Sequence, residues 1–407
     1  MCLCPEFFKK TISIFETLII YNKKKLCMVR YSLLLAILCS MIGMQSCIHG
    51  ELDDCPPMVN YAVAFEYTNH AWDNDRFYDD VKKINLFVFD EKNKKLVYTT
   101  DVEKLATQEP FPPNFTIPLN LPMGNYHILA WGNVLKDKDN KDNFLITPTP
   151  LEFVKGETTL DEARLTLQRK AGNLSNKDFE KLFFGELDTV SIPLYVSRVD
   201  TMPLMNDTKK VRVVIHWDHT GESRATEEII NYDDVHVRLE ASNAEYNFRN
   251  NLTAGAGVKN VIYTPYDSCY NNSVLDTDAR AFEDVVYYYP HEGDFKTTSN
   301  TCVYDFTILR MMTNSPISLV IERSKKAVPQ PVNLLSEPIN IIYDFAELYK
   351  TKGMIEPKDH QLHFNRFDNY RIDIYFTYDQ IAGEYVTGSM NLLDWHDVYH
   401  PEPGGAD

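Results

Sequence analysis

The segment INLFVFDEKNKKLVYTT at residues 84–100 carries the strongest fold signal in the chain. Its first six residues are apolar on both faces of an extended strand, which is typical of a strand in the interior of a sheet. The charged turn at residues 90–95 and the following LVYTT predict an antiparallel hairpin. The segment therefore indicates a hairpin whose first strand is central in its sheet.

Further strand signals surround this hairpin. Residues 59–67 place Val, Tyr, Val, Phe and Tyr on alternate positions, which is the period of a half-buried strand. Residues 115–121 and 126–131 flank the turn sequence PMGN at 122–125. Short strands at close spacing with little helical periodicity predict an all-β sandwich.

The second half of the chain repeats this pattern. About 360 residues follow the N-terminal segment, which is more than one core usually holds and predicts two domains. We expect β-sandwiches at residues 59–205 and 206–396, with short helical insertions and a tail at 397–407. The best helix candidate is Ile339–Tyr349. Strands are expected at residues 211–217, 235–239, 285–289, 302–309, 317–321, 370–376 and 385–393.

The first 46 residues have the composition of a signal peptide. A basic stretch that ends at Arg30 precedes the uncharged run from Tyr31 to Ser46, which is too short to span a bilayer comfortably. Cys47 follows the small residue Ser46, as in the lipobox of bacterial lipoproteins. We expect cleavage before Cys47, acylation of its thiol and a lipidated leader at residues 47–58. The signal sequence begins cleanly at Met28, which is a candidate for the true start.

Charge and cysteine content restrict the function classes. The full chain has a net charge of −17, and the 35 basic and 56 acidic residues after residue 46 give −21. Such a surface repels phosphates, so no nucleic acid partner is expected. Only Cys47, Cys55, Cys269 and Cys302 follow the cleavage point. A disulfide between Cys269 and Cys302 is one pairing that the sequence allows.

Catalytic and metal-binding motifs are poor. His396 and His400 are four residues apart, which on a helix would allow a shared metal, but they stand in a Pro/Gly-flanked tail after a predicted strand. Two further pairs, at 216 and 219 and at 360 and 363, have no carboxylates at ligand spacing. The last two pairs stand in strand-like contexts, where exposed side chains are expected. Residues 137–142 resemble a calcium loop but have Asp142 where Gly is required. We expect no enzyme activity, no metal and no cofactor beyond the covalent lipid on Cys47.

Aromatic residues suggest a rival function. Trp72, Trp131, Trp217 and Trp395, together with 24 tyrosines, could form a platform that stacks on sugars of a surface glycan. Trp131 and Trp217, however, lie at the ends of predicted strands. Large aromatics at such positions in sandwiches usually belong to the core. We therefore expect both indoles to be buried.

Several segments, in their order and spacing, resemble the FimB-type fimbrial anchor family of Bacteroidales. They include DCPP at 54–57, FEYT at 65–68, INLFVFDE at 84–91, LPMGNYHILAWGN at 121–133 and NLLDW at 391–395. The resemblance covers nearly the whole chain after Cys47. It implies two tandem transthyretin-like β-sandwiches, held to the outer membrane by lipid. The implied function is anchoring of fimbriae through pilin subunits and a part in ending their growth. Tip and shaft pilins are similar, and remain alternatives beside the glycan-binding lipoprotein.

One feature favours an anchor over a shaft pilin. The resemblance implies that pilins lose their lipid when an arginine-directed protease cuts after the first strand. Between Ile48 and Asp75 this chain has no Lys or Arg, and Arg76 is the first site. We therefore expect the lipid to stay attached. Thr189 and Thr201, in Asp-Thr-Val and Asp-Thr-Met triplets of the predicted interdomain linker, are candidates for the O-glycosylation of these bacteria.

Overall fold

The computed structural model describes residues 61–394 except 71–73, 105–110, 113, 137–140, 149–152, 194–196, 219–233, 254–258, 272–298, 325–329, 355 and 380–383. The predicted signal peptide, the lipidated leader and the C-terminal tail lie outside the described residues. From Val59 onward the chain forms one compact unit. Within the described residues, no helix has the length and apolar character needed to cross a membrane.

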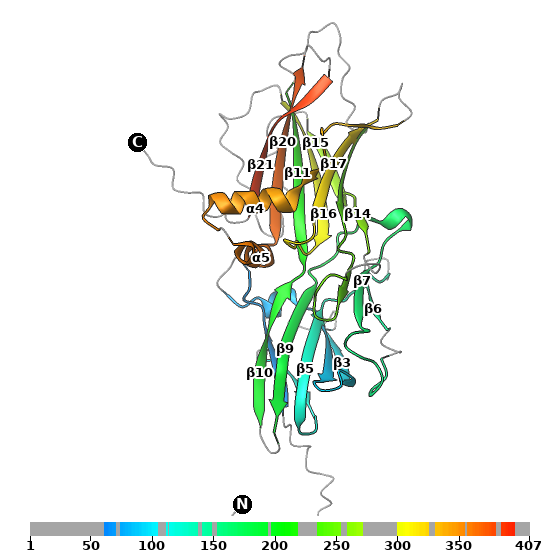
Figure 1. Ribbon diagram of the computed structural model, residues 1–407, viewed down its shortest axis with the longest axis vertical. Coiled ribbons are helices and arrows are strands. Elements are labelled where there is room, and N and C mark those ends of the chain that lie inside the picture. The colour runs from blue at the N-terminus through cyan, green and yellow to red at the C-terminus, as the bar shows by residue number, and fades with distance from the viewer. Residues whose placement is uncertain are drawn as a thin grey trace, which may run out of the picture. The chain divides into compact units, whose positions relative to one another are not determined.

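A seven-stranded sheet contains every long strand that precedes Asp207 (Figure 1). Its spatial order is β3-β2-β5-β9-β10-β1-β4. The strands are β1 (Tyr61–Glu66), β2 (Lys83–Asp90), β3 (Leu96–Glu103), β4 (Thr116–Leu119), β5 (Gly124–Gly132), β9 (Phe183–Ile192) and β10 (Arg198–Asn206).

The interior position predicted for residues 84–89 is confirmed. Strand β2 pairs antiparallel with β3 on one side and with β5 on the other. Leu86 and Val88 belong to the core on one face of the sheet. Phe87 and Phe89 point to the opposite face and join the second core, where their rings meet Phe248. Two buried faces explain why this strand is apolar throughout.

A five-stranded sheet begins directly after Asp207. Its order is β15-β16-β11-β20-β21, and β11 pairs antiparallel with β16 and parallel with β20. Every described strand predicted in this region is present, whereas residues 285–289 lie outside the described residues. The strands are β11 (Thr208–Asp218), β15 (Asp267–Asn271), β16 (Ser299–Leu309), β20 (Asn369–Asp379) and β21 (Glu384–Asp394).

Two smaller sheets complete the β structure. One has the order β18-β17-β12-β14-β8, with β19 paired to β17, and the other the order β13-β7-β6. Strand β13 comes from the second half of the chain but pairs with β7 of the first. The division at residue 206 stays a prediction. The strands are β6 (Phe144–Thr147), β7 (Arg164–Leu167), β8 (Leu174–Ser175), β12 (Val235–Ala241), β13 (Glu245–Asn247), β14 (Val261–Tyr263), β17 (Ile317–Arg323), β18 (Val332–Asn333) and β19 (Ile339–Asn340).

The described helices are short. They are α3 (Phe77–Asp80), α4 (Ile341–Thr351), α5 (Pro357–Arg366) and the 3-10 turn η2 (Ala171–Asn173). Helix α4 confirms the predicted helix, and the Asn340 side chain caps it by accepting a hydrogen bond from the Tyr343 amide. Helix α5 shows that the strand-like context predicted for His360 and His363 is wrong. Pro357 at its first turn favours a helix start.

Candidate functional site

Strand β1 is the first described element after Cys47, the predicted lipidation site, and it lies inside the seven-stranded sheet. It pairs in parallel with β10 and antiparallel with β4. Tyr61, Val63 and Phe65 are buried, as the alternating pattern predicts. Because both edges of β1 carry ladder hydrogen bonds, its removal would open the sheet and expose a core face.

The segment that follows β1 is fixed by local hydrogen bonds. The Asp75 carboxylate accepts from the amides of Tyr67 and Phe77, at 2.8 and 2.9 Å. The Arg76 amide donates to the Tyr67 carbonyl oxygen at 3.0 Å. The Arg76 guanidinium lies 3.2 Å from the Asp80 carboxylate. The first basic residue after Cys47 is therefore held in a structured turn.

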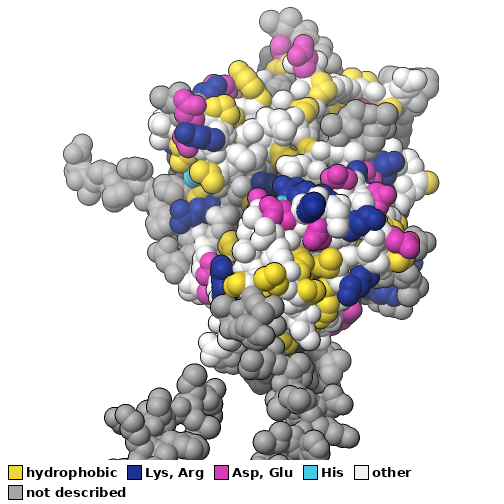
Figure 2. Space-filling view, turned by 60° about the horizontal axis from the view of Figure 1, so that its bottom comes forward, with side chains coloured by type: hydrophobic (Ala, Val, Ile, Leu, Met, Phe, Trp, Pro, Cys, Tyr) yellow, Lys and Arg dark blue, Asp and Glu magenta, His cyan; other side chains and the backbone are white. Residues whose placement is uncertain are grey.

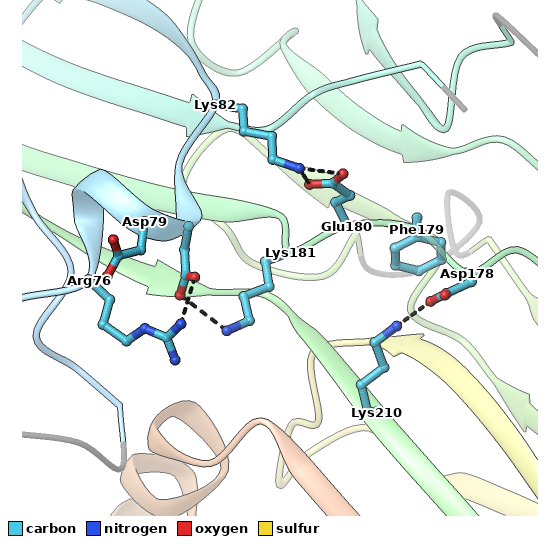
Figure 3. A pocket seen from close by; sticks show the side chains of 9 residues that line it. Arg76, Asp79, Lys82, Asp178, Phe179, Glu180, Lys181 and Lys210 are labelled. Carbon is cyan, nitrogen blue, oxygen red and sulfur yellow. Dashed lines mark hydrogen bonds and ion pairs between the residues drawn. The ribbon is translucent and has the colours of Figure 1, made fainter. Parts of the chain in front are cut away.

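Arg76 lines a pocket of about 410 Å³ in which cationic and anionic side chains alternate (Figure 3). Lys181 lies 3.2 Å from Asp80, and Lys82 lies 2.6 Å from Glu180. The other lining residues include Lys210, which contacts Asp178. Because the opposite charges in this pocket are paired with one another, it offers little free charge to a ligand.

A buried ionic joint connects β1 to the five-stranded sheet. Asp368, just before β20, lies 3.3 Å from the ammonium group of Lys209 in β11 and 3.5 Å from that of Lys181. The Tyr67 hydroxyl donates to the same carboxylate at 3.1 Å. Burial opposes ionisation of Asp368, but the two ammonium groups outweigh it and lower its pKa. Lys209 is fully buried, so its charge depends on this partner.

Asp207, between β10 and β11, is a second buried carboxyl group. The nearest cation is the Arg310 guanidinium, 3.9 Å away, and the Asp207 side chain has no exposed surface. Burial raises the pKa of Asp207 from 3.8 to about 6. Because the folded state binds this proton more tightly, the stabilisation is complete below the unfolded pKa and is lost as pH rises through about 6.

Replacement of Asp207 by Asn should therefore raise stability above pH 6. We expect Asp207→Asn to increase the free energy of unfolding by about 1 to 3 kcal/mol at pH 7.5 and to change it little at pH 4. Urea titrations between pH 4 and 8 measure this difference. The exposed Asp161→Asn is the matched control. A variant whose pH profile parallels that of the wild type would show that Asp207 is not the titrating group.

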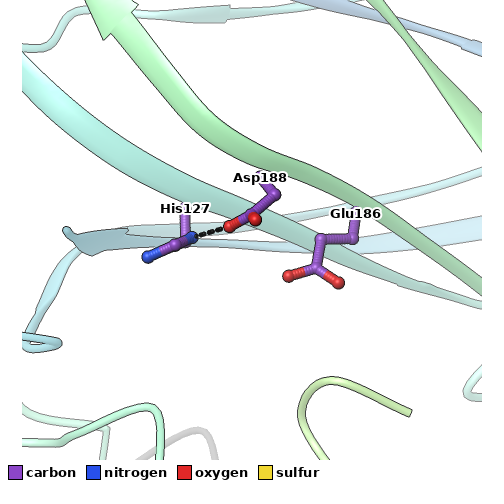
Figure 4. A group of neighbouring side chains, drawn as sticks. All are labelled: His127, Glu186 and Asp188. Carbon is purple, nitrogen blue, oxygen red and sulfur yellow. Dashed lines mark ion pairs between the residues drawn. The ribbon is translucent and has the colours of Figure 1, made fainter.

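One cluster was not anticipated from the sequence. His127 in β5 lies beside Glu186 and Asp188 in β9, with the His127 Nδ1 atom 2.5 Å from Asp188 (Figure 4). Lys94 and Arg249 contact the same imidazole. Burial, followed by these two cations, lowers the pKa of His127. A metal ion there would face two positive charges, so we assign no metal site.

The sheet edges differ in how well they could accept another strand. Strand β4 has four residues and contains Pro118, which lacks an amide donor. Strand β3 carries the charges of Asp101 and Glu103. Strand β21 has eleven residues, no proline and no charge between its terminal residues. Among the described strands its sole partner is β20, so one of its edges is free of ladder hydrogen bonds there.

The structure corrects the expected exposure of two histidines. His216 is buried in β11, and its Nε2 atom lies 2.8 Å from the Asp373 carboxylate. His360 is buried in α5, and its Nε2 atom lies 2.6 Å from the Met354 carbonyl oxygen. Both predictions of exposed side chains are wrong, because each ring is buried and has a polar partner. His219, His396 and His400 lie outside the described residues.

The predicted modification sites are placed as follows. Thr189 and Thr201 are exposed, but they lie within β9 and β10, so the prediction that they occupy an interdomain linker is wrong. The β15–β16 register sets Cys269 opposite Val303 and Cys302 opposite Tyr270. Neither glycosylation nor the disulfide is tested by these positions. Cys47 lies outside the described residues.

The tryptophan predictions are confirmed where the structure describes them. Trp131 and Trp217 are fully buried in the core. They therefore cannot stack on a surface glycan. Trp72 and Trp395 lie outside the described residues. On the face drawn in Figure 2, Lys and Arg side chains are interspersed with Asp and Glu, and no broad basic patch is present there.

Comparison with known proteins identifies the class and then the family. Solved structures of a candidate polysaccharide-binding protein and a candidate adhesin, both from Bacteroides thetaiotaomicron, each have a TM-score of 0.58 and are 23% and 21% identical. Each alignment covers 82% of this chain and 96% of the other. The fimbrial anchor protein Mfa2 from Porphyromonas gingivalis has a TM-score of 0.55 and 17% identity, over 82% and 97% of the two chains. These identities show a shared fold.

Residues 52–400 match the family described as fimbrillin-A associated anchor proteins Mfa1 and Mfa2. The chain belongs to this family. The resemblance to fimbrial anchors is thereby confirmed, as are the mostly β fold and the assignment to a family that is not enzymatic. No curated protein matches the chain significantly.

Proposed function

We propose that this protein is an outer-membrane lipoprotein, exposed on the cell surface, that anchors fimbriae and takes part in ending their assembly by β-strand complementation. Membership in the anchor family supports the anchoring role. The observation that carries the proposal is the interior position of β1 between β10 and β4. An acyl chain on Cys47 would be joined through a short leader to a strand that the sheet retains.

Retention of the lipid follows from the same geometry. No Lys or Arg occurs between Ile48 and Asp75. Arg76 is paired with Asp80, and its amide donates to the carbonyl oxygen of Tyr67, the residue directly after β1. A protease must bind its substrate in an extended form, so cleavage at Arg76 would require this turn to unfold. An anchor of this design keeps its lipid, whereas a shaft pilin would release it.

Strand β21 is the edge that we assign to the pilin. Its backbone amides and carbonyls on one side have no partner among the described residues, and a strand from a fimbrillin subunit could pair with them. Val386 and Thr387 are exposed and uncharged, so the side chains present no barrier to a neighbouring strand. We further propose that the sheets before and after Asp207 correspond to the two tandem transthyretin-like sandwiches.

Proline substitutions at two adjacent residues of β21 test this assignment. In an antiparallel strand, successive amides point alternately toward the neighbour and away from it. Of Val386→Pro and Thr387→Pro, one therefore removes a hydrogen bond to β20 and the other removes a donor at the free edge. We expect the second to keep the melting temperature nearly unchanged and to lose attached fimbriae. If both variants keep their fimbriae, a pilin strand does not bind at β21.

A deletion strain distinguishes the proposed anchor from the rival functions. Loss of attached fimbriae, with free polymers in the medium, supports the anchor. Unchanged fimbriae with reduced binding of cells to polysaccharide would indicate a surface glycan-binding lipoprotein instead. Absence of any polymer would indicate a tip or shaft pilin that assembly requires. Intact-mass measurement of native protein also tests the proposed sugars on Thr189 and Thr201 and the Cys269–Cys302 disulfide.

A further inference from the structure

A groove of about 1210 Å³ is lined by β8, by residues that directly follow β7 and by the start of β15, and none of its described lining residues belongs to β1 or β21. The residues that line it come from segments on both sides of Asp207. Most of them are charged or carry amides, and Leu174 is the single aliphatic residue among them. They are Lys136, Lys141, Asp142, Asn143, Gln168, Arg169, Lys170, Leu174, Ser175, Asn176, Lys177, Asp178, Glu180, Tyr266 and Asp267.

The groove is electropositive although the chain is acidic. Five of its lining residues are cationic and four are anionic. Two of the anionic residues, Asp178 and Glu180, are paired with Lys210 and Lys82, which lie outside this lining. Among its described lining residues, the groove therefore keeps an excess of three positive charges. Because the full chain has a net charge of −17, this local positive charge would attract an anionic ligand to the groove.

Three of the cations have no carboxylate partner among the described residues. Lys170 donates to the Asn176 carboxamide oxygen at 2.7 Å. Arg169 donates to the Asn173 carboxamide oxygen at 3.1 Å and to a backbone carbonyl oxygen. Lys136 is exposed. These neutral contacts orient the cations and leave their charges uncompensated.

Ser175 supplies a second, independent observation. The residue is 3% exposed, and its hydroxyl oxygen has no hydrogen-bond partner among the described residues. A buried hydroxyl without a partner costs free energy, so such a group at a groove wall is a candidate ligand contact. Asn143, Gln168 and Asn176 add carboxamides, which can donate to one hydroxyl of a sugar and accept from the next.

We propose that this groove binds an anionic polysaccharide whose acidic groups are uronic carboxylates. The cationic side chains would form ion pairs with the carboxylates, and the amides and Ser175 would form hydrogen bonds with the hydroxyl groups of the sugar rings. A single-stranded nucleic acid would require several aromatic stacking platforms, and Tyr266 is the one aromatic residue in the described part of the lining. A peptide strand would require apolar side-chain pockets, whereas Leu174 is the one aliphatic residue among the lining residues that the structure describes. This site is separate from β21 and does not depend on the proposed anchoring role.

Titration calorimetry with three short oligomers tests the class of ligand. The probes are hexagalacturonate, neutral maltohexaose and hexaglutamate, each added to the purified protein at low and at physiological salt. We expect hexagalacturonate to bind with an affinity that falls as salt rises, and the other two to bind at least tenfold more weakly. Failure of hexagalacturonate to bind would overturn the proposal. Equal binding of hexaglutamate would also overturn it, in favour of an acidic peptide partner.

Charge-matched variants test the position of the site. Lys136→Gln with Lys170→Gln removes two groove cations, and Lys92→Gln with Lys95→Gln removes two lysines from the exposed β2–β3 turn. We expect the groove pair to weaken hexagalacturonate binding about tenfold per lysine, and the control pair to leave it unchanged. Equal losses in both pairs would show nonspecific attraction and refute the groove.

The variant Ser175→Ala distinguishes a role of the hydroxyl in ligand binding from a role in folding. Because the hydroxyl has no hydrogen-bond partner in the part of the chain that the structure describes, its removal should leave the melting temperature unchanged or slightly higher. We expect the same variant to bind hexagalacturonate several-fold more weakly. Unchanged binding would exclude Ser175 as a contact. Attached fimbriae should remain in every groove variant, so failure of this proposal is distinguishable from failure of the anchoring role.

Discussion

Asp368→Asn is expected to lower the free energy of unfolding by about 3 to 5 kcal/mol at pH 7. The substitution keeps the shape of the side chain but leaves the fully buried ammonium group of Lys209 without its carboxylate. It also weakens the contact from the Tyr67 hydroxyl, which connects the end of β1 to the second sheet. Denaturant titration of the purified protein measures the loss.

Two control variants test whether the loss of stability comes from the unpaired charge of Lys209. Glu347→Gln breaks an exposed ion pair with Lys350 and should cost about 0 to 1 kcal/mol. Adding Lys209→Met to Asp368→Asn removes the unpaired charge and should restore most of the stability. Burial already lowers the pKa of Lys209, so the deficit of the single variant should shrink as pH rises toward 10. A loss no larger than that of Glu347→Gln would refute the buried joint.

Cys47→Ala is expected to abolish retention at the membrane. Acyl chains hold a protein by about 0.8 kcal/mol per buried methylene group, and no described helix could replace them. The variant should be recovered in the soluble fraction, and fimbriae should be shed into the medium. Cys55→Ala is the matched control, because it removes a cysteine eight residues later and should stay in the membrane fraction. Membrane retention of Cys47→Ala would refute lipidation at this residue.

Sequence patterns predict most reliably those strands and helices whose burial shows in the spacing of neighbouring apolar residues. The apolar run of β2 and the alternation of β1 each predict their burial from period alone, and the structure agrees. The position of Asn340 at the start of α4 is likewise a local signal. Helix α5 was missed because its polar sequence, HQLH, has apolar residues at too few positions to show a helical period.

Pairing across long distances in the chain could not be predicted. Tyr61 pairs with Arg198, and His216 contacts Asp373. The residues of each pair are too far apart in the sequence for a short motif to predict the contact. The same is true of the groove, whose lining begins at Lys136 and ends at Asp267. Burial of His216 is a consequence of the parallel β11–β20 pair, since that register brings the carboxylate to the ring. Local sequence patterns predict where the strands are, whereas the positions of the sites depend on pairing between strands that are far apart in the sequence.

Mass spectrometry of the N-terminus of the native protein, extracted from outer membranes with detergent, tests the central claim most directly. If the protein is an anchor whose lipid stays attached to β1, its first residue is an acylated Cys47 and residues 48–76 follow without a cut. A free N-terminus at Phe77, directly after Arg76, would show that protease removes the lipid together with β1. That result would contradict the anchor and place the protein among the processed pilins.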